Sequence, residues 1–402
     1  MLRALVALGD PRQLVAMREL AASPRARRAT VRDYLARALP NAIAQLEAVS
    51  VSSIDDEQRW RALLPARDDA ARDGRSASEL LAAIYQDPDD DDSRRVYADL
   101  LQEAGDPRGE LIGLQLQQAR GAASSKEERR VRALLRAHRG QWIGEDLERV
   151  LNKVVFERGF LFAAELAQNA VATDEIWQRA AADERLATLR ELHKGRGSAR
   201  RLQLFVEGAA RNLTSLEVPS NTILDVLVGL PGPRALQALS LPRPPSRKKL
   251  AAMVEASSLA NLRRLTLTID PGDIERVLGD LRRYRLLERL QALTLQPSGY
   301  QVEDGPAVMR LWAELPVKLS YLAYGHEHAR FVIERRADGR CIARCVGWAA
   351  DFAAAFASAL PGEVRELVFT PCKHGGPTPE KQAIAAATRG RVEPLEVRFE
   401  GY

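Results

Sequence analysis

The chain contains few cysteines and no long apolar run. Three cysteines in 402 residues cannot supply a disulfide framework, so a reducing cytoplasm is the expected compartment. Asp10 and Pro11 break the first apolar stretch, which leaves it too short for the hydrophobic region of a signal peptide. The most apolar later stretch, residues 348–360, contains Asp351 and is mostly alanine, so it cannot span a bilayer. We therefore expect a soluble cytoplasmic protein with no membrane association.

Motifs for catalysis and cofactor binding are also absent from the sequence. The chain has no nucleophile elbow, no P-loop, no zinc-protease helix and no dinucleotide fingerprint. Gly195 and Gly197 form an isolated pair that lacks the strand-to-helix spacing of a phosphate-binding loop. We therefore predict a non-enzymatic protein without a cofactor.

The charge is nearly balanced, because 59 Lys and Arg against 54 Asp and Glu give a net charge of +5. The sharpest basic stretches, at residues 25–28, 196–201 and 243–249, have no interleaved aromatic residues that would stack on bases. We interpret them as solvated faces. The alternative is a nucleic-acid surface, for which the candidate residues are Arg196, Arg200, Arg201, Arg243, Arg247, Lys248 and Lys249.

The N-terminal part has the apolar spacing of packed helices. We predict a small helical unit at residues 1–65, followed by a polar linker at residues 66–76. A second helical unit begins at residue 77, where the Ser76 hydroxyl can cap a helix. The acidic run Asp87–Asp92 breaks this helix and favours a turn and the next helix cap. Its carboxylates also suit Ca²⁺ or Mg²⁺, but the run lacks the glycine and distal Glu of a calcium loop.

Residues 85–115 of this unit have a distinctive sequence, YQDPDDDDSRRVYADLLQEAGDPRGELIGLQ. It resembles the bacterial repeat-companion domain, which is common in myxobacteria and planctomycetes and stands beside repeats, often leucine-rich ones. The resemblance is strong over residues 78–118 and extends loosely to residue 166, so we assign residues 77–166 to a helical repeat-companion domain. Leu100 stands where the family usually has Trp. The family has no established activity to carry over, so the resemblance implies architecture only.

A repeated leucine pattern fills residues 180–402. Its template is an aliphatic residue, two others, Leu, one other, and an aliphatic or aromatic residue. The clear copies, at intervals of 23, 26 and 28 residues, are Leu213-Leu216-Val218, Leu236-Leu239-Leu241, Leu262-Leu265-Leu267 and Leu290-Leu293-Leu295. The looser copies are Leu186-Leu189, Leu319-Leu322-Tyr324, Val364-Leu367-Phe369 and Val392-Leu395-Val397. These intervals are typical of leucine-rich repeats.

The pattern predicts an α/β fold, an irregular leucine-rich-repeat solenoid preceded by the helical N-terminal units. Two leucines separated by one residue lie on one face of a short strand, and parallel stacking of such strands buries those faces as one core. Apolar periodicity between the strands predicts return helices. The turn position that usually holds Asn or Cys does so only at Asn221 and Cys372, which predicts uneven turns. A long interval before Val364 contains residues 331–346, which we predict to form a β-hairpin around Asp338 and Gly339.

The predicted function is that of an adaptor or sensor that binds a protein partner on the strand face. In a short strand, the residues between the buried leucines point outward. The residues nominated as partner contacts on this basis are Arg190, Glu217, Ser240, Thr266, Thr294 and Arg398.

A zinc site or a cysteine enzyme is the remaining alternative. The candidate ligands, Cys341, Cys345, Cys372 and His374, lie in the C-terminal quarter together with His326 and His328. Their spacing fits no zinc template, because Cys341 and Cys345 are expected along a strand instead of a tight turn. The other interpretation is that these two cysteines are small core residues and that Cys372 occupies the turn position.

Overall fold

The computed structural model divides the chain into two compact units, Met1–Arg75 and Ser76–Tyr402. The residues that it describes are 18, 37–44, 74–121, 124–167, 172–193, 198–270, 272–299, 305–326, 329–348, 357–371, 382, 384–388 and 395–399. In the first unit, residues 37–44 are helical, and Leu39 and Ala42 are buried. Most of the helical unit predicted at residues 1–65 lies outside the described residues.

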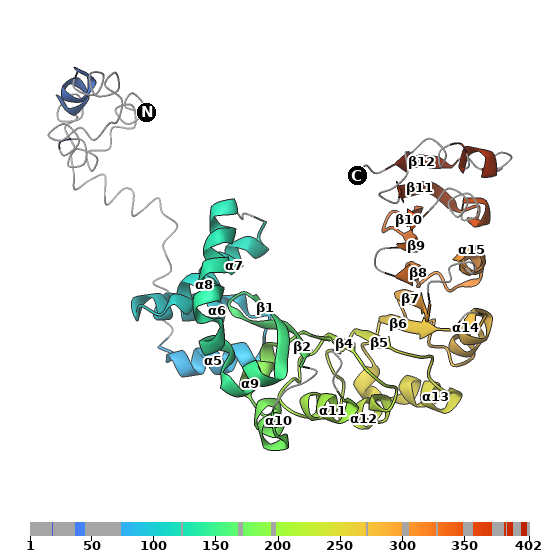
Figure 1. Ribbon diagram of the computed structural model, residues 1–402, viewed down its shortest axis with the longest axis horizontal. Helices are drawn as coiled ribbons and strands as arrows, with labels where there is room; N and C mark the ends of the chain where they lie inside the picture. The colour runs from blue at the N-terminus through green and yellow to red at the C-terminus, as the bar shows by residue number, and fades with distance from the viewer. Residues whose placement is uncertain are drawn as a thin grey trace. The chain divides into compact units, whose positions relative to one another are not determined.

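The second unit begins with helices that are capped as their sequences require (Figure 1). They are α5 (Ala77–Gln86), α6 (Asp91–Glu103), α7 (Pro107–Ala119), α8 (Ser125–Ile143) and α9 (Glu145–Val150). Ser76 and Glu79 form a capping box at α5, and Asp90 accepts hydrogen bonds from the backbone at the start of α6. Asp106 caps α7, in which Pro107 takes the first position, where its missing N–H costs nothing.

A β-hairpin follows these helices, so the helical domain predicted at residues 77–166 contains two strands at its end. Strands β1 (Leu151–Glu157) and β2 (Phe160–Leu166) pair antiparallel. Arg158 and Gly159, which join them, have φ angles of 50° and 79°. A two-residue hairpin turn of type I′ has positive φ at both central positions, and Gly159 adopts it without strain. β2 then pairs with β3, which places the hairpin in the same sheet as the leucine pattern.

The described strands form one 12-stranded sheet in which chain order and spatial order coincide. After β1 and β2 come β3 (Glu191–His193), β4 (Ser215–Glu217), β5 (Ala238–Leu241), β6 (Arg264–Ile269), β7 (Ala292–Pro297), β8 (Tyr321–His326), β9 (Ala329–Arg335), β10 (Cys341–Trp348), β11 (Val364–Pro371) and β12 (Glu396–Phe399). Neighbouring strands are parallel except at β1–β2, β8–β9 and β9–β10. The sheet is open, and the predicted α/β class with short parallel strands is confirmed.

Leucines stand next to one another across the parallel strands. Successive Cα pairs in the register join Leu192, Leu216, Leu239, Leu265, Leu293 and Leu322, which we call the leucine row. Each of them is at most 1% exposed. The backbone repeats with them: the carbonyl oxygen of Thr214 accepts from the N–H groups of Gln237 and Ala238, and equivalent pairs recur from Arg190 to Gln291. Local spacing therefore produces a continuous core.

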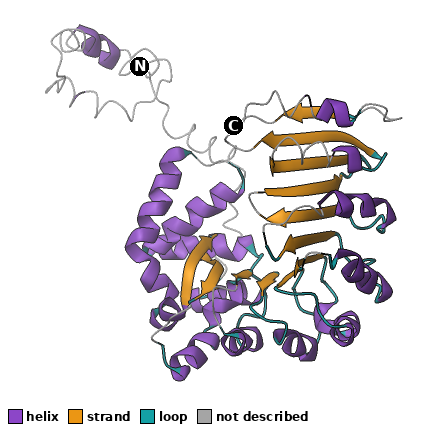
Figure 2. Ribbon diagram, turned by 45° about the vertical axis from the view of Figure 1, so that its right-hand side comes forward, coloured by secondary structure: helices purple, strands orange, loops and turns teal. Residues whose placement is uncertain are grey.

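Helices connect the parallel strands and lie on one side of them (Figure 2). They are α10 (Asp174–Ala181), η2 (Glu184–Thr188), α11 (Ala199–Glu207), α12 (Ile223–Gly229), α13 (Arg247–Glu255), η3 (Ser257–Leu259), α14 (Ile274–Arg283), α15 (Gly305–Arg310) and η4 (Leu311–Glu314). One apolar cluster extends from Leu111 in α7 to Ile384, so the helical part and the sheet share a core. No described helix is long and apolar enough to cross a membrane.

Two details of the predicted pattern differ in the structure. The first copy, Leu186-Leu189, is three residues out of frame, because Leu192 is the residue that pairs with Leu216. The predicted hairpin at residues 331–346 corresponds to β9 and β10, which pair antiparallel. β9 also pairs with β8, and β10 pairs with β11, so both strands belong to the main sheet.

Candidate functional site

The outward side of β3 to β8, together with residues just before β7 and β8, borders a hollow of about 530 Å³. Its lining residues are Glu191, Ser215, Ala238, Arg264, Leu265, Thr266, Gln291, Ala292, Thr294, Ser320 and Tyr321. We call the outward surface of these strands the strand face. The site is built by the strand register, because each strand contributes the side chains that alternate with its buried leucines.

One register row crosses the hollow from end to end. Its members pair in the order Glu191, Ser215, Ala238, Arg264, Ala292 and Tyr321. Ser215, Ala238 and Ala292 are small, and this leaves space between the longer side chains of Glu191, Arg264 and Tyr321. The hollow therefore results from a particular choice of residues at positions that the leucine pattern leaves free.

Four of the six predicted contacts lie on the strand face. Glu217, Ser240, Thr266 and Thr294 pair in that order as the second outward row, and each is half-buried. Thr266 and Thr294 also line the hollow. The leucine template places these residues because it fixes which positions in each strand point away from the core.

Arg190 is not part of the strand face. It precedes β3, its side chain is only 11% exposed, and its guanidinium pairs with Asp89. It also donates to the carbonyl oxygen of Asn212 at 3.2 Å. Arg190 was nominated because the leucine template was placed three residues too early, at Leu186-Leu189. The outward residues of that strand are Glu191 and His193.

Arg398 lies on β12, the last strand of the sheet, far in strand order from the hollow. Its guanidinium lies 2.9 Å from Glu396 and 3.5 Å from Glu366, so its charge is compensated within the chain. It is in the same register row as Thr266 and Thr294, but Ala323 and Val332, which come between them, are buried. Arg398 therefore makes no common surface with the other nominated residues.

Sequence reasoning missed a histidine surrounded by carboxylates at the β3 end of the strand face. The His193 ring nitrogens lie 3.6 Å from Glu191 and 3.8 Å from Glu217. The Glu217 carboxylate, with Glu191 and Glu165, raises the pKa of His193 against the effect of burial. Placing the leucine template at Leu189 and Leu192, 24 residues before Leu213 and Leu216, would have identified His193 as an outward residue.

The acidic run Asp87–Asp92 acts in capping and in ion pairs. Asp90 caps α6, and Asp87 accepts a hydrogen bond from the backbone N–H of Asp89. Asp89 pairs with Arg190 and lies 3.4 Å from Arg158. These two guanidiniums lower the pKa of Asp89, outweighing the burial that acts to raise it. The run therefore ties α6 to the β1–β2 turn and to β3.

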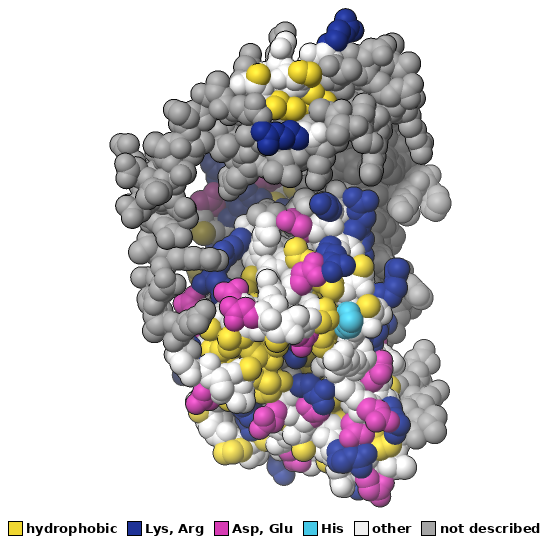
Figure 3. Space-filling view, turned by 90° about the vertical axis from the view of Figure 1, so that its left-hand side faces the viewer, with side chains coloured by type: hydrophobic (Ala, Val, Ile, Leu, Met, Phe, Trp, Pro, Cys, Tyr) yellow, Lys and Arg dark blue, Asp and Glu magenta, His cyan; other side chains and the backbone are white. Residues whose placement is uncertain are grey.

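The basic residues nominated for nucleic acid are divided between paired and exposed positions. Arg247 lies 2.9 Å from Asp280, and Lys249 lies 2.9 Å from Asp225. The Arg201 guanidinium stacks 4.7 Å from the centre of the Trp177 ring. Arg200, Arg243 and Lys248 are exposed, and Arg196 lies outside the described residues. The face in Figure 3 also shows Lys and Arg interspersed with Asp and Glu, without a large patch of one sign.

Cys341 and Cys345 are buried in β10, where they share one face of the strand. Burial raises the pKa of both thiols, and that of Cys345 lies well above its ordinary value. A raised pKa disfavours the thiolate that a zinc site or a nucleophile needs. Cys372 and His374 lie outside the described residues, and within the described part of the chain no three His, Cys, Asp or Glu side chains gather as metal ligands.

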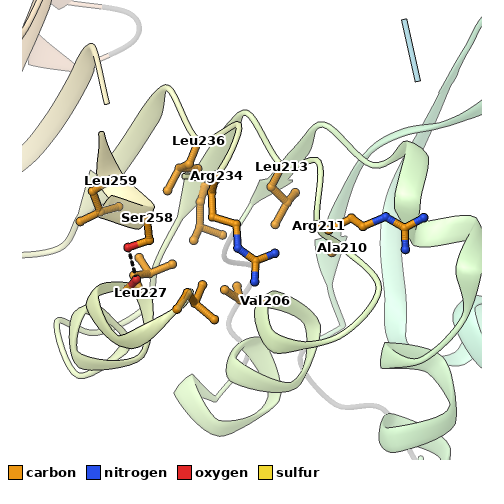
Figure 4. A pocket seen from close by; sticks show the side chains of 11 residues that line it. Val206, Ala210, Arg211, Leu213, Leu227, Arg234, Leu236, Ser258 and Leu259 are labelled. Atoms are coloured by element: carbon orange, nitrogen blue, oxygen red, sulfur yellow. Dashed lines mark hydrogen bonds between the residues drawn. The ribbon is translucent and has the colours of Figure 1, made fainter. Parts of the chain in front are cut away.

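A small, partly open cavity of about 20 Å³ lies among α11, β4, α12 and η3 (Figure 4). Most of its lining is aliphatic, including Val206, Leu213 and Leu236, and Arg234 extends among them. Ser258 donates a hydrogen bond to the carbonyl oxygen of Leu227 at 2.6 Å. The cavity has room for about one water molecule, so it is a packing feature and not a ligand pocket.

Comparison with protein-family models, curated proteins and solved structures finds no match to this chain. The strand face is therefore interpreted from its own geometry. Its polar groups are distributed along the strands, except that His193, Glu191 and Glu217 lie together at the β3 end.

Proposed function

We propose that this chain is a non-enzymatic cytoplasmic adaptor or sensor of bacterial type, built on an irregular leucine-rich-repeat solenoid. The proposal rests on the in-register leucine row and on the helices that return between its strands. Each repeat of such an array contacts mainly its neighbours, and the stacked strands present an extended surface for binding. The partner is a protein, and the strand face binds it.

The single observation that carries the binding function is the hollow on the strand face. It is open to solvent, it takes side chains from six successive strands, and its lining combines Thr, Ser, Arg, Glu and Tyr. Tyr and Arg are enriched at protein interfaces, where they provide contact area together with hydrogen bonds. A hollow of this size accepts several side chains of a partner.

We also propose that residues 77–166 are a repeat-companion domain that closes one end of the array. Without this domain, the apolar residues at that end of the array would have no neighbouring strand to pack against. Terminal repeats need such a cap. Contacts between the two parts support this role: Asp89 pairs with Arg190, and Arg211 donates to the carbonyl oxygen of Tyr85 at 3.3 Å.

Site-specific photo-crosslinking in lysate of the source organism tests the binding function. A photoreactive amino acid at Thr294, inside the hollow, is expected to crosslink a defined protein. The matched control carries the same group at Lys248, which is exposed on α13.

The variant Thr266→Arg, made in the chain that carries the photoreactive group at Thr294, narrows the hollow with a long side chain and is expected to abolish capture of that protein. Capture that is equal from Thr294 and Lys248, or that persists in the Thr266→Arg variant, would show that the strand face is not the binding site. Crosslinks to nucleic acid instead of protein would support the alternative surface.

A further inference from the structure

The strand face carries opposite charges at two separate places. Glu191 lies at the β3 end of the hollow, and Arg264 lies on β6, three strands further along the same register row. Parallel strands are about 4.8 Å apart, so the two positions are separated by about 14 Å. Ser215 and Ala238 occupy the positions between them, and their short side chains leave the path open.

The β3 end is acidic beyond Glu191. Glu217 lies on the neighbouring strand, and Glu157 of β1 is close enough for its charge to act on that of Glu191. His193 stands between Glu191 and Glu217, and Lys153 is already paired with Glu165 at 2.8 Å. Arg158 also acts on Glu157, but it is paired with Asp89 and Asp91, so the carboxylates outnumber the cationic groups at this end even with His193 protonated. A positively charged group of a ligand would therefore be attracted to the β3 end of the hollow.

Arg264 attracts the opposite charge, a negatively charged group of a ligand. Its side chain is exposed in the hollow, and among the described residues no carboxylate forms an ion pair with it. Its neighbours in the row, Ala238 and Ala292, are too short to screen it. A guanidinium in this setting is suited to bind a carboxylate through two parallel hydrogen bonds.

We propose that the hollow binds an extended peptide segment with a lysine or arginine against Glu191 and Glu217 and a carboxylate against Arg264. This inference deepens the proposed function and rests on it. An extended chain advances about 3.3 Å per residue, so the 14 Å between the sites is spanned by about four residues. The partner segment then has a basic and an acidic side chain about four positions apart.

The same charges argue against a nucleic acid in the hollow. Phosphates would meet Arg264 but would be repelled by the carboxylates at the β3 end. A peptide can carry both signs. Its intervening residues can contact Ser215 and Ser240, and residues beyond its carboxylate can contact Thr294 and Tyr321. The polar, half-buried threonines suit hydrogen bonding to such a segment.

Display of random peptides against the full chain tests this pairing of charges. The wild-type protein is expected to enrich peptides with Lys or Arg about four positions from Asp or Glu. The variant Arg264→Glu is expected to enrich peptides with basic residues at both positions. The matched control, Lys248→Glu on α13, makes the same charge change away from the hollow and is expected to retain the wild-type preference. Circular dichroism checks that both variants are folded.

Affinity provides the second readout. For a synthetic peptide chosen from the wild-type selection, Arg264→Gln and Glu191→Gln are each expected to weaken binding about fivefold, the effect of one exposed ion pair. Failure to enrich any class, or enrichment that is unchanged in Arg264→Glu, overturns the charge assignment. If Thr294 still crosslinks a protein in that case, the strand face remains a binding site and only the charge pairing is wrong.

Discussion

The part of the sheet from β3 to β8 and the part of the chain from α5 to β2 bury their apolar residues in different ways. In the first part, one leucine position recurs in every strand, and each leucine packs beside its equivalents on the adjacent strands. In the second part, residues distant in sequence converge on one aromatic ring. The first arrangement is periodic and local, and the second depends on a few specific contacts.

Phe160 is the centre of the second arrangement. Its ring lies 6.4 Å from that of Tyr85 and 6.2 Å from that of Tyr97, and the guanidiniums of Arg94 and Arg108 lie 5.3 and 4.5 Å from its centre. We call these five residues the Phe160 cluster. The ring offsets the burial of two guanidiniums, because a cation above an aromatic face is stabilised electrostatically.

Gln115 in α7 adds hydrogen bonds beside this cluster. Its side-chain amide donates to the carbonyl oxygen of Phe156 at 2.8 Å and accepts from the N–H of Gly159 at 2.7 Å. Both partners belong to the hairpin that carries Phe160. The comparison suggests that a substitution in the leucine row has local effects, whereas one in the Phe160 cluster releases the helices from the hairpin.

The largest expected effect is that of Phe160→Ala. The change leaves a cavity among Tyr85 and Tyr97 and removes the aromatic face from two buried guanidiniums. We expect a loss of about 3–5 kcal/mol in the free energy of unfolding, measured by urea denaturation. Hydrogen exchange should accelerate throughout α5, α6 and α7. Val155→Ala, at a position 46% exposed on β1, is the matched control and should change little. Exchange that accelerates only next to residue 160 would contradict the comparison.

A smaller effect is expected from Leu239→Ala in the leucine row. Leu239 is 1% exposed and pairs with Leu216 and Leu265. We expect a loss of about 3 kcal/mol, again measured by urea denaturation. Faster exchange should be confined to β4, β5 and β6, because, among the described strands, β5 pairs with only β4 and β6. Ser240→Ala, on the opposite face of the same strand, is the control. A loss of protection that reaches the Phe160 cluster would show that the two parts unfold as one.

The smallest effect is expected from Asp89→Asn, which breaks the link between the two parts. Arg190 and Arg158 lower the folded-state pKa of Asp89, so its contribution to stability is present above the unfolded-state pKa. It is lost as the pH falls through the folded-state pKa. Because Asp89 is 67% exposed, we expect the variant to be less stable by under about 1 kcal/mol at pH 7.

The urea midpoints of the Asp89→Asn variant and the unchanged protein should converge once the pH is below the folded-state pKa of Asp89, which lies below the usual Asp pKa. Asp92→Asn is the control, since Asp92 pairs only with Arg95 of its own helix among the contacts of the described residues. A difference that stays constant with pH would mean that the charge of Asp89 plays no part.

The leucine spacing predicted the strand face from Glu217 to Thr294 but failed at β3. There, several leucines three residues apart, Leu186, Leu189 and Leu192, allow more than one frame, and only pairing with β4 selects Leu192. The hairpin at residues 151–166 was also missed, because its strands follow directly on helices. Its turn, Arg158-Gly159, becomes recognisable once β1 and β2 are known to pair.

The sequence by itself determined the leucine row from Leu216 to Leu322 and the outward positions beside it. A strand alternates its side chains with a period of two, so one short pattern settles which residues are buried and which face solvent. Only the tertiary structure decided which charged side chains form ion pairs and which remain exposed. Asp89 and Arg190 pair across 101 positions of the chain, and Arg264 is left exposed beside small neighbours. Such pairings depend on the distance between folded elements, about which local spacing carries no information.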